Sequence, residues 1–183
     1  MREFDKMLAG ELYNPMDEEL LNLRINARKI TEEYNRTSVS EQEKRKELLE
    51  KLFGKEIEGA YIEPNFKCDY GINIYAGKNL YINFDCVILD VAKVVLGDNC
   101  FIAPQVGIYT ATHPIDSNQR NSGLEYGKQV TIGNNCWIGG RAIINPGVTL
   151  GDNVVVGAGS VVTKSFGSNV VIAGNPARVI KNI

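Results

Sequence analysis

The sequence predicts a mainly β protein whose chain winds into a stacked coil, closed at one end by helices. Three observations support this prediction. An aliphatic residue recurs every six positions between residues 70 and 163, with two extra residues between Ile88 and Leu96, whereas residues 1–53 lack that period and show helical spacing instead. The six-residue period also stops between Ile108 and Ile132, in a polar segment that carries the only histidine, His113. The chain is therefore expected to be one coil with a helical cap and a loop that leaves the coil.

The coil is indicated by a column of aliphatic residues and by small or apolar residues that follow most of them four positions later. Such a short, regular period indicates turns that stack and bury one another's inner faces. Triplets such as Gly97-Asp98-Asn99 favour corners where the backbone adopts positive φ, so the strands between corners should be very short. The aliphatic positions are Ile82, Ile88, Leu96, Ile102, Ile108, Ile132, Ile138, Ile144, Leu150, Val156 and Val162.

Two helices are expected in the cap, residues 1–53. Asp17 is a good N-cap for a helix whose apolar residues follow from Leu20 to Tyr34 at helical spacing. Ser40 and Glu43 match a capping box before a second strong helix former that ends near residue 53. A cap of this kind is needed because the open end of a solenoid exposes its hydrophobic core. The coil domain then comprises residues 54–183, with an excursion loop at 109–131 and a C-terminal tail.

Composition narrows the class of protein. The 183 residues include 20 basic and 22 acidic side chains, and this balance argues against nucleic acid as the main partner. No apolar run approaches the roughly 20 residues of a membrane helix, and the first residues lack the apolar core of a signal peptide. We therefore expect a cytoplasmic protein that does not engage membranes.

The cysteines and the histidine limit the possible metal chemistry. Cys68, Cys86, Cys100 and Cys136 form no C-x-x-C pair, and each occupies the small-residue position of the six-residue frame, so all four are predicted to pack in the core. A single histidine cannot build a histidine-rich zinc site. No metal is expected.

His113 is the strongest candidate for chemistry. It lies at the start of the excursion loop, in the string YTATHPID, and insertions in repeat proteins tend to gather on a functional face. Histidine is also the side chain best suited to exchange a proton near neutral pH.

Several strings resemble the hexapeptide-repeat sugar O-acetyltransferases. They include KMLAGELY, EPNFKCDYGINI, NFDCVILDV, YTATHPID, VTIGNNCWIGGRAIINPGVTLGDN and GNPARVIK, and together they span most of the chain. The resemblance implies a left-handed parallel β-helix, a homotrimer with sites between subunits, and acetyl-CoA as cosubstrate. The implied reaction moves an acetyl group to a hydroxyl of a sugar such as maltose or glucose.

The resemblance also assigns the residues of the acceptor site. His113 matches the family's general base, which would take the hydroxyl proton. Asp69 and Asn83 match residues near the acceptor, although Asn83 is equally well explained as a corner residue. Asp17 is a further acceptor candidate whose alignment slips by about two residues, and its N-cap role explains it as well.

The cosubstrate is expected to contact a second group of residues. The N–H of Gly140 matches the family's donor to the oxyanion of the tetrahedral intermediate. Trp137 either lies along the pantetheine arm or packs between subunits. Without the resemblance, Lys164 and Arg178 are best explained as solvated surface charges. The resemblance implies instead that they bind the phosphates of CoA. The CoA positions are Gly140, Ala158, Thr163, Lys164, Arg178, Lys181 and Trp137.

Two other functions remain open at this point. The chain could acetylate another small acceptor, such as a galactoside, a nucleotide sugar, an amino acid or an antibiotic. It could also be a non-catalytic β-solenoid used for assembly, although a scaffold has no need of a histidine in the excursion loop or of a basic tail.

Overall fold

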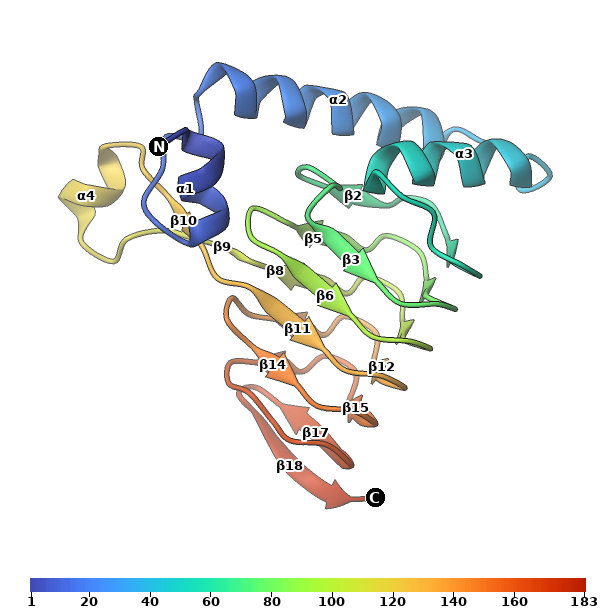
Figure 1. The fold of residues 1–183 in the computed structure, drawn as a ribbon. Helices are drawn as coiled ribbons and strands as arrows, with labels where there is room; N and C mark the ends of the chain where they lie inside the picture. Colours follow the sequence, from blue (N-terminus) through green and yellow to red (C-terminus); the bar gives the residue numbers. More distant parts are fainter.

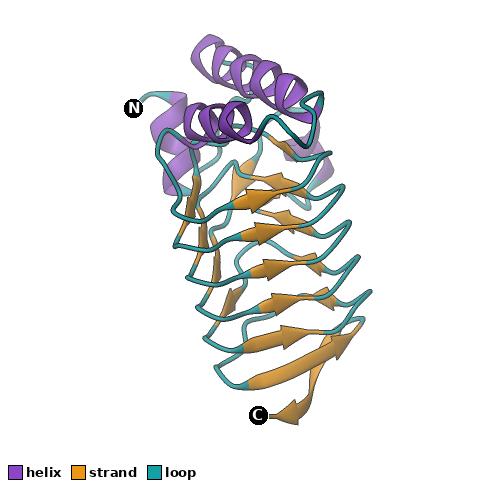
Figure 2. Cartoon of the chain, turned by 90° about the vertical axis from the view of Figure 1, so that its right-hand side faces the viewer, coloured by secondary structure: helices purple, strands orange, loops and turns teal.

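The computed structural model describes residues 1–183 as a parallel β-helix with three flat faces, capped by helices at its N-terminal end (Figure 1). The fold class predicted from the six-residue period is confirmed. Figure 2 shows the turns stacked below the helices, with the C-terminus at the opposite end.

Each face of the coil is one sheet of short strands. The first sheet contains β1 (Tyr61–Ile62), β4 (Tyr81–Ile82), β7 (Phe101–Ile102), β12 (Trp137–Ile138), β15 (Val154–Val156), β17 (Val170–Gly174) and β18 (Ala177–Asn182). The second contains β2 (Lys67–Cys68), β5 (Val87–Leu89), β8 (Gly107–Tyr109), β13 (Ile143–Ile144) and β16 (Val161–Val162). The third contains β3 (Ile74–Ala76), β6 (Val94–Leu96), β11 (Val130–Ile132) and β14 (Thr149–Leu150).

The aliphatic column forms the core, as predicted. Every aliphatic position of the period is buried, and in the first sheet Ile82, Ile102, Ile138 and Val156 stack in exact register from turn to turn. All four cysteines are buried free thiols within the coil's single large apolar cluster. Burial raises the pKa of each thiol, so none of them is an activated nucleophile.

The glycine corners differ from the prediction in one respect. Positive φ falls on Asn99, and likewise on Asn135 and Asn153, and not on the glycines that begin these triplets. The glycines are required for another reason. A Cβ on Gly97 would lie 2.6 Å from the backbone nitrogen of Asn134 in the next turn. Close stacking of successive corners therefore excludes a side chain there.

The cap contains three helices, one more than predicted: α1 (Glu3–Ala9), α2 (Glu18–Asn35) and α3 (Gln42–Phe53). Asp17 is the N-cap of α2, because its side chain accepts hydrogen bonds from the N–H groups of Glu19 and Leu20. The capping box at Ser40 and Glu43 was wrong. The Glu41 carboxylate accepts from the N–H of Ser38 instead, two residues earlier.

The excursion loop leaves the coil after β8 and returns at β11. It contains an antiparallel pair, β9 (Ala111–Thr112) with β10 (Tyr126–Gly127), and a short helix, α4 (Ser117–Asn121), so it is more ordered than a polar loop. Figure 1 shows it projecting to one side of the coil, beside α1. None of the helices is both long and apolar enough to cross a membrane.

Candidate active site

The three sheets meet along three edges, and two of these edges carry the predicted site residues. The first edge consists of the turns that lead from the first sheet to the second, at residues 83–86, 103–106, 139–142 and 157–160. The second edge leads from the second sheet to the third and includes residues 69–73, the excursion loop and residues 163–165.

His113 lies on the second edge, at the end of β9. Its side chain is 56% exposed, and its Nε2 is 3.9 Å from the Glu125 Oε2. The antiparallel pairing of β9 with β10 brings these two residues together although twelve positions separate them. The pair gives a proton-accepting imidazole and a carboxylate able to stabilise the imidazolium that forms when the proton is taken.

Glu125 is itself fixed by the cap. The phenol of Tyr13, which is fully buried, donates to the Glu125 Oε1, and the backbones of the two residues form an antiparallel bridge. Sequence reasoning missed both residues. Glu125 could have been found by treating the loop as a hairpin, whereas nothing local to Tyr13 indicates its partner.

Asp69 follows β2 on the same edge as His113. Its carboxylate accepts no hydrogen bond, and burial raises its pKa, with a further contribution from the Glu125 carboxylate. The backbone N–H groups of Asp69 and Tyr70 donate to the Oδ1 of Asp90, at 3.0 and 2.9 Å. Asp90 is fully buried, its Oδ2 has no partner, and burial raises its pKa to about 6. Asp90 thus fixes the backbone that presents Asp69.

Asn83, Gly140 and Ala158 lie on the first edge. In these turns the third residue has positive φ, and in the last three of the four its N–H donates to the carbonyl of the second residue one turn above, as Arg141 does to Pro104 at 2.9 Å. This pattern leaves the N–H of the second residue without a partner in the coil. The second residues are Phe84, Pro104, Gly140 and Ala158.

Only two of these four positions present a free N–H group. The N–H of Phe84 donates to the side chain of Asn83 at 2.8 Å, so Asn83 does act as a corner residue, and Pro104 has no N–H. The N–H groups of Gly140 and Ala158 donate no hydrogen bond within the chain. Two adjacent outward donors suit a carbonyl or oxyanion that comes to lie along this edge.

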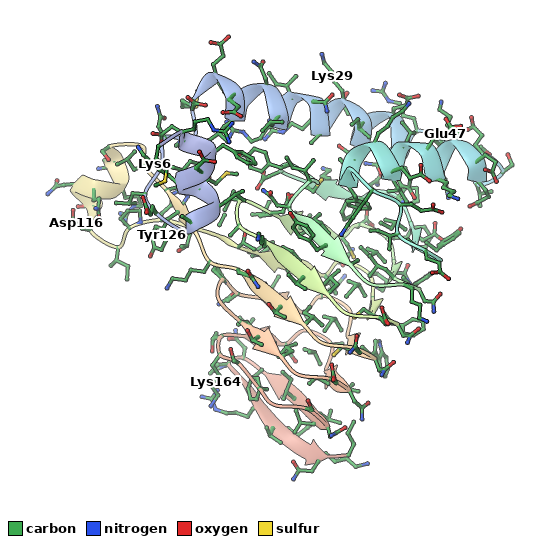
Figure 3. The ribbon with its side chains drawn as sticks, viewed as in Figure 1. Lys6, Lys29, Glu47, Asp116, Tyr126 and Lys164 are labelled. Carbon is green, nitrogen blue, oxygen red and sulfur yellow. The ribbon has the colours of Figure 1, made fainter.

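The basic residues are divided between the edges. Thr163 and Lys164 follow β16 on the second edge, and Figure 3 shows Lys164 on the same side of the coil as Asp116 and Tyr126 of the loop. Arg178 follows the turn between β17 and β18. This turn lies at the first edge, because the N–H of Gly174 at its start donates to the Oγ of Ser160 at 3.1 Å. Lys181 lies farther along β18, opposite Val171. None of these three cations is paired with a carboxylate.

Trp137 is on the outer face of the first sheet and is 56% exposed. It stacks in register between Phe101 and Val155, below the ring pair of Tyr61 and Tyr81, whose centroids are 5.9 Å apart. Four successive turns therefore present an aromatic ladder to the outside. No group of three or more His, Cys, Asp or Glu side chains is arranged to bind a metal ion.

The structure therefore does not bring all predicted residues into one place within a single chain. His113, Asp69, Thr163 and Lys164 share the second edge, and Asn83, Gly140, Ala158 and Arg178 share the first. Asp17 is accounted for by its N-cap bonds alone. The turn that contains Gly140 precedes β13 (Ile143–Ile144) and Asn145 follows it, so the two edges are separated by the width of one second-sheet strand, roughly 10 Å.

Comparison with known proteins shows which families the chain resembles. The sequence model described as the maltose acetyltransferase hexapeptide capping motif matches residues 6–56, and the hexapeptide repeat of succinyl-transferase matches residues 129–164. A maltose O-acetyltransferase from Clostridium difficile 630 is 53% identical, with a TM-score of 0.98 over 100% of this chain and 98% of the other.

Two further solved structures contain the coenzyme. A galactoside acetyltransferase in complex with coenzyme A is 44% identical, with a TM-score of 0.96 over 100% of this chain and 92% of the other. A hexapeptide-repeat acetyltransferase from Vibrio cholerae O1 biovar eltor, complexed with acetyl coenzyme A, is 34% identical, with a TM-score of 0.92 over 100% and 98%.

Proposed function

The chain belongs to the maltose and galactoside O-acetyltransferase family of hexapeptide-repeat proteins and is an acetyl-CoA-dependent acetyltransferase, and we propose that its acceptor is the hydroxyl of a glucose-type sugar such as maltose or glucose. The maltose O-acetyltransferase similarity supports this choice of sugar. A galactoside is the competing acceptor, because a galactoside acetyltransferase is also closely similar.

In the proposed reaction His113 is the general base. It takes the proton from the sugar hydroxyl as that oxygen attacks the thioester carbonyl of acetyl-CoA. The N–H of Gly140 donates to the oxyanion of the resulting tetrahedral intermediate. When the C–S bond breaks, the proton passes from His113 to the departing CoA thiolate. Glu125 orients the imidazole and stabilises its charged form between the two proton transfers.

The separation of the two edges is the observation that carries the proposed site. A base and an oxyanion donor must both lie within a few ångströms of the reacting carbonyl. In one chain His113 and the free N–H of Gly140 are on opposite edges of the second sheet. We therefore propose a homotrimer in which the second edge of one copy faces the first edge of the next.

This arrangement also collects the cosubstrate residues. Acetyl-CoA would lie in the groove between two copies, with the N–H groups of Gly140 and Ala158 and the side chain of Arg178 on one wall. Thr163 and Lys164 would lie on the other wall, together with the His113 loop. Lys181 and Trp137 would contribute from the outer face of the first sheet, where the aromatic ladder offers apolar surface to the assembly.

Asp69 and Asn83 would complete the acceptor site from opposite walls. The carboxylate of Asp69 can accept hydrogen bonds from sugar hydroxyls, and the Nδ2 of Asn83 remains free to donate because only its Oδ1 is used in the corner. Asp17 would stabilise the cap that supports this wall. We expect the enzyme to act in the cytoplasm, in agreement with four cysteines that remain free thiols.

The test is an initial-rate assay of CoA-thiol release with maltose, glucose and a galactoside as acceptors. We expect the glucose-type sugars to be preferred. His113→Ala should retain CoA binding and lose about 10²–10⁴-fold in kcat. Preference for the galactoside, absence of turnover with every sugar, or near-normal turnover in the His113→Ala variant would each contradict the proposal.

A further inference from the structure

A cavity of about 340 Å³ lies between α2 and the outer face of the second sheet. Arg28 and Glu32 reach it from the helix, and Lys67 and Asp69 reach it from the end of β2 and the residue that follows. Lys29, on the next position of α2, stands on the side of the helix away from the coil (Figure 3). The cavity is therefore a feature of the inner face of α2.

Two anchors fix the helix above the cavity. At one end the Arg24 guanidinium donates to the Tyr70 hydroxyl at 2.7 Å. At the other end the side-chain amide of Asn35 both donates to and accepts from the backbone of Phe66, each at 2.9 Å. Because α2 is tied down on both sides, the cavity is preformed and does not depend on a ligand to open it.

The chemistry of the lining suits a sugar ring. Arg28, Glu32, Lys67 and Asp69 form neither an ion pair nor a side-chain hydrogen bond within the chain, so donors and acceptors of both signs remain free. The apolar side chains of Val87 and Leu89 complete the wall contributed by β5. Vicinal hydroxyls need donors and acceptors at once, and the C–H face of a pyranose packs on apolar surface.

The cavity shares Asp69 with the proposed acceptor site, because this residue lines the cavity and follows β2 on the same edge as His113. The charges of both Glu125 and Arg28 act on the Asp69 carboxylate, since Glu125 raises its pKa and Arg28 lowers it. Glu125 is the partner of His113. A ligand that contacts Asp69 from the His113 side can thus extend into the space beneath α2.

We propose that this cavity binds the non-reacting sugar residue of a di- or oligosaccharide acceptor, while the residue that carries the reacting hydroxyl lies at His113. The proposal rests on the sugar acetyltransferase function proposed above. Lys67 and Glu32 would donate to and accept from the hydroxyls of the second ring, and Asp69 would contact both rings. The enzyme should accordingly prefer a disaccharide to a monosaccharide of the same sugar.

The test compares kcat/KM for maltose with kcat/KM for glucose at saturating acetyl-CoA. In the wild-type enzyme the ratio should exceed one. Lys67→Ala and Glu32→Ala should each reduce it about tenfold, as expected for one lost hydrogen bond to a charged group. The matched control is Lys29→Ala, which removes the same charge from the opposite side of α2 and should leave the ratio unchanged.

The outcomes separate the two proposals. Turnover of both sugars with a ratio of one, or a ratio that Lys67→Ala and Glu32→Ala do not change, would reject the second-ring site while the sugar acetyltransferase function stands. No turnover of either sugar would overturn both. If the KM for acetyl-CoA rises in the Lys67→Ala variant while the sugar ratio stays constant, the cavity belongs to the cosubstrate and the proposal is wrong.

Discussion

Sites shared between copies can be tested by mixing two inactive variants. His113→Ala removes the base from the second edge. Gly140→Pro removes the N–H donor from the first edge and leaves the turn intact, because Pro104 already occupies the equivalent position one turn above. A Cβ at Gly140 would approach no atom more closely than 3.4 Å. Each variant alone should fold and lose at least about 10²-fold in kcat.

The expected recovery follows from the cyclic symmetry of a trimer. Each site would use His113 of one copy and Gly140 of the next. In any trimer that contains both variants, a site is intact only where a Gly140→Pro copy supplies the histidine and a His113→Ala copy supplies the N–H. That occurs at one of the three interfaces whichever variant is in excess, so mixed trimers should show about a third of wild-type activity.

The assay uses co-expressed variants that carry different affinity tags, purified through both tags so that only mixed assemblies remain. CoA-thiol release at saturating maltose is then compared with that of each parent. Gly140→Ala, which keeps the N–H, is the control and should remain active in the unmixed enzyme. Mixed assemblies no more active than their parents would show that both groups act within one copy, and a monomeric active enzyme would do the same.

Three further outcomes are expected. Arg178→Ala should raise the KM for acetyl-CoA more at low than at high salt, with kcat little changed. An unchanged KM at every salt concentration would show that Arg178 is only a solvated surface charge. Gly133→Ala should destabilise the fold by about 1–3 kcal/mol because its Cβ would lie 2.5 Å from a carboxylate oxygen of the next turn, while Gly167→Ala, which meets nothing within 4 Å, should be tolerated in a thermal melt. Because burial raises the pKa of Asp90 to about 6, its contribution to stability is complete below about pH 4 and is lost as pH rises through 6. Urea titrations should therefore show that the free energy of unfolding of the wild type, measured relative to that of Asp90→Asn, falls by up to about 3 kcal/mol between pH 4 and pH 7. If the two proteins give parallel pH curves, burial does not raise the pKa of Asp90.

The coil was predictable because every turn repeats the same physical requirement. One aliphatic residue fills the interior at each sixth position, so the period is visible in residues such as Ile102 and Ile138 without any knowledge of long-range contacts. The corner residues were predicted less well. The sequence shows Gly-Asp-Asn triplets, but only the stacked turns show that the asparagine takes positive φ and that the glycine prevents a clash.

The site residues were predictable only where the neighbouring sequence distinguishes a residue from others of its type. His113 stands out because it is unique and interrupts the period. Glu125 and Tyr13 do not stand out, since one is among many acidic residues and the other precedes the first predicted helix. Their bond spans 112 positions and depends on how the loop folds back onto the cap. Contacts of that kind come from tertiary packing and leave no periodic trace in the sequence.

The regular coil by itself explains why the excursion loop is needed. A turn of the coil directs its apolar residues inward and its corner donors outward, so the first edge can offer N–H groups to a ligand but no base. An insertion at one corner solves this problem, because it carries His113 away from the coil while β9, β10 and the Tyr13 bridge keep it fixed. On this argument, shortening the loop between β9 and β10 should abolish acetyl transfer and leave the coil's thermal stability nearly unchanged.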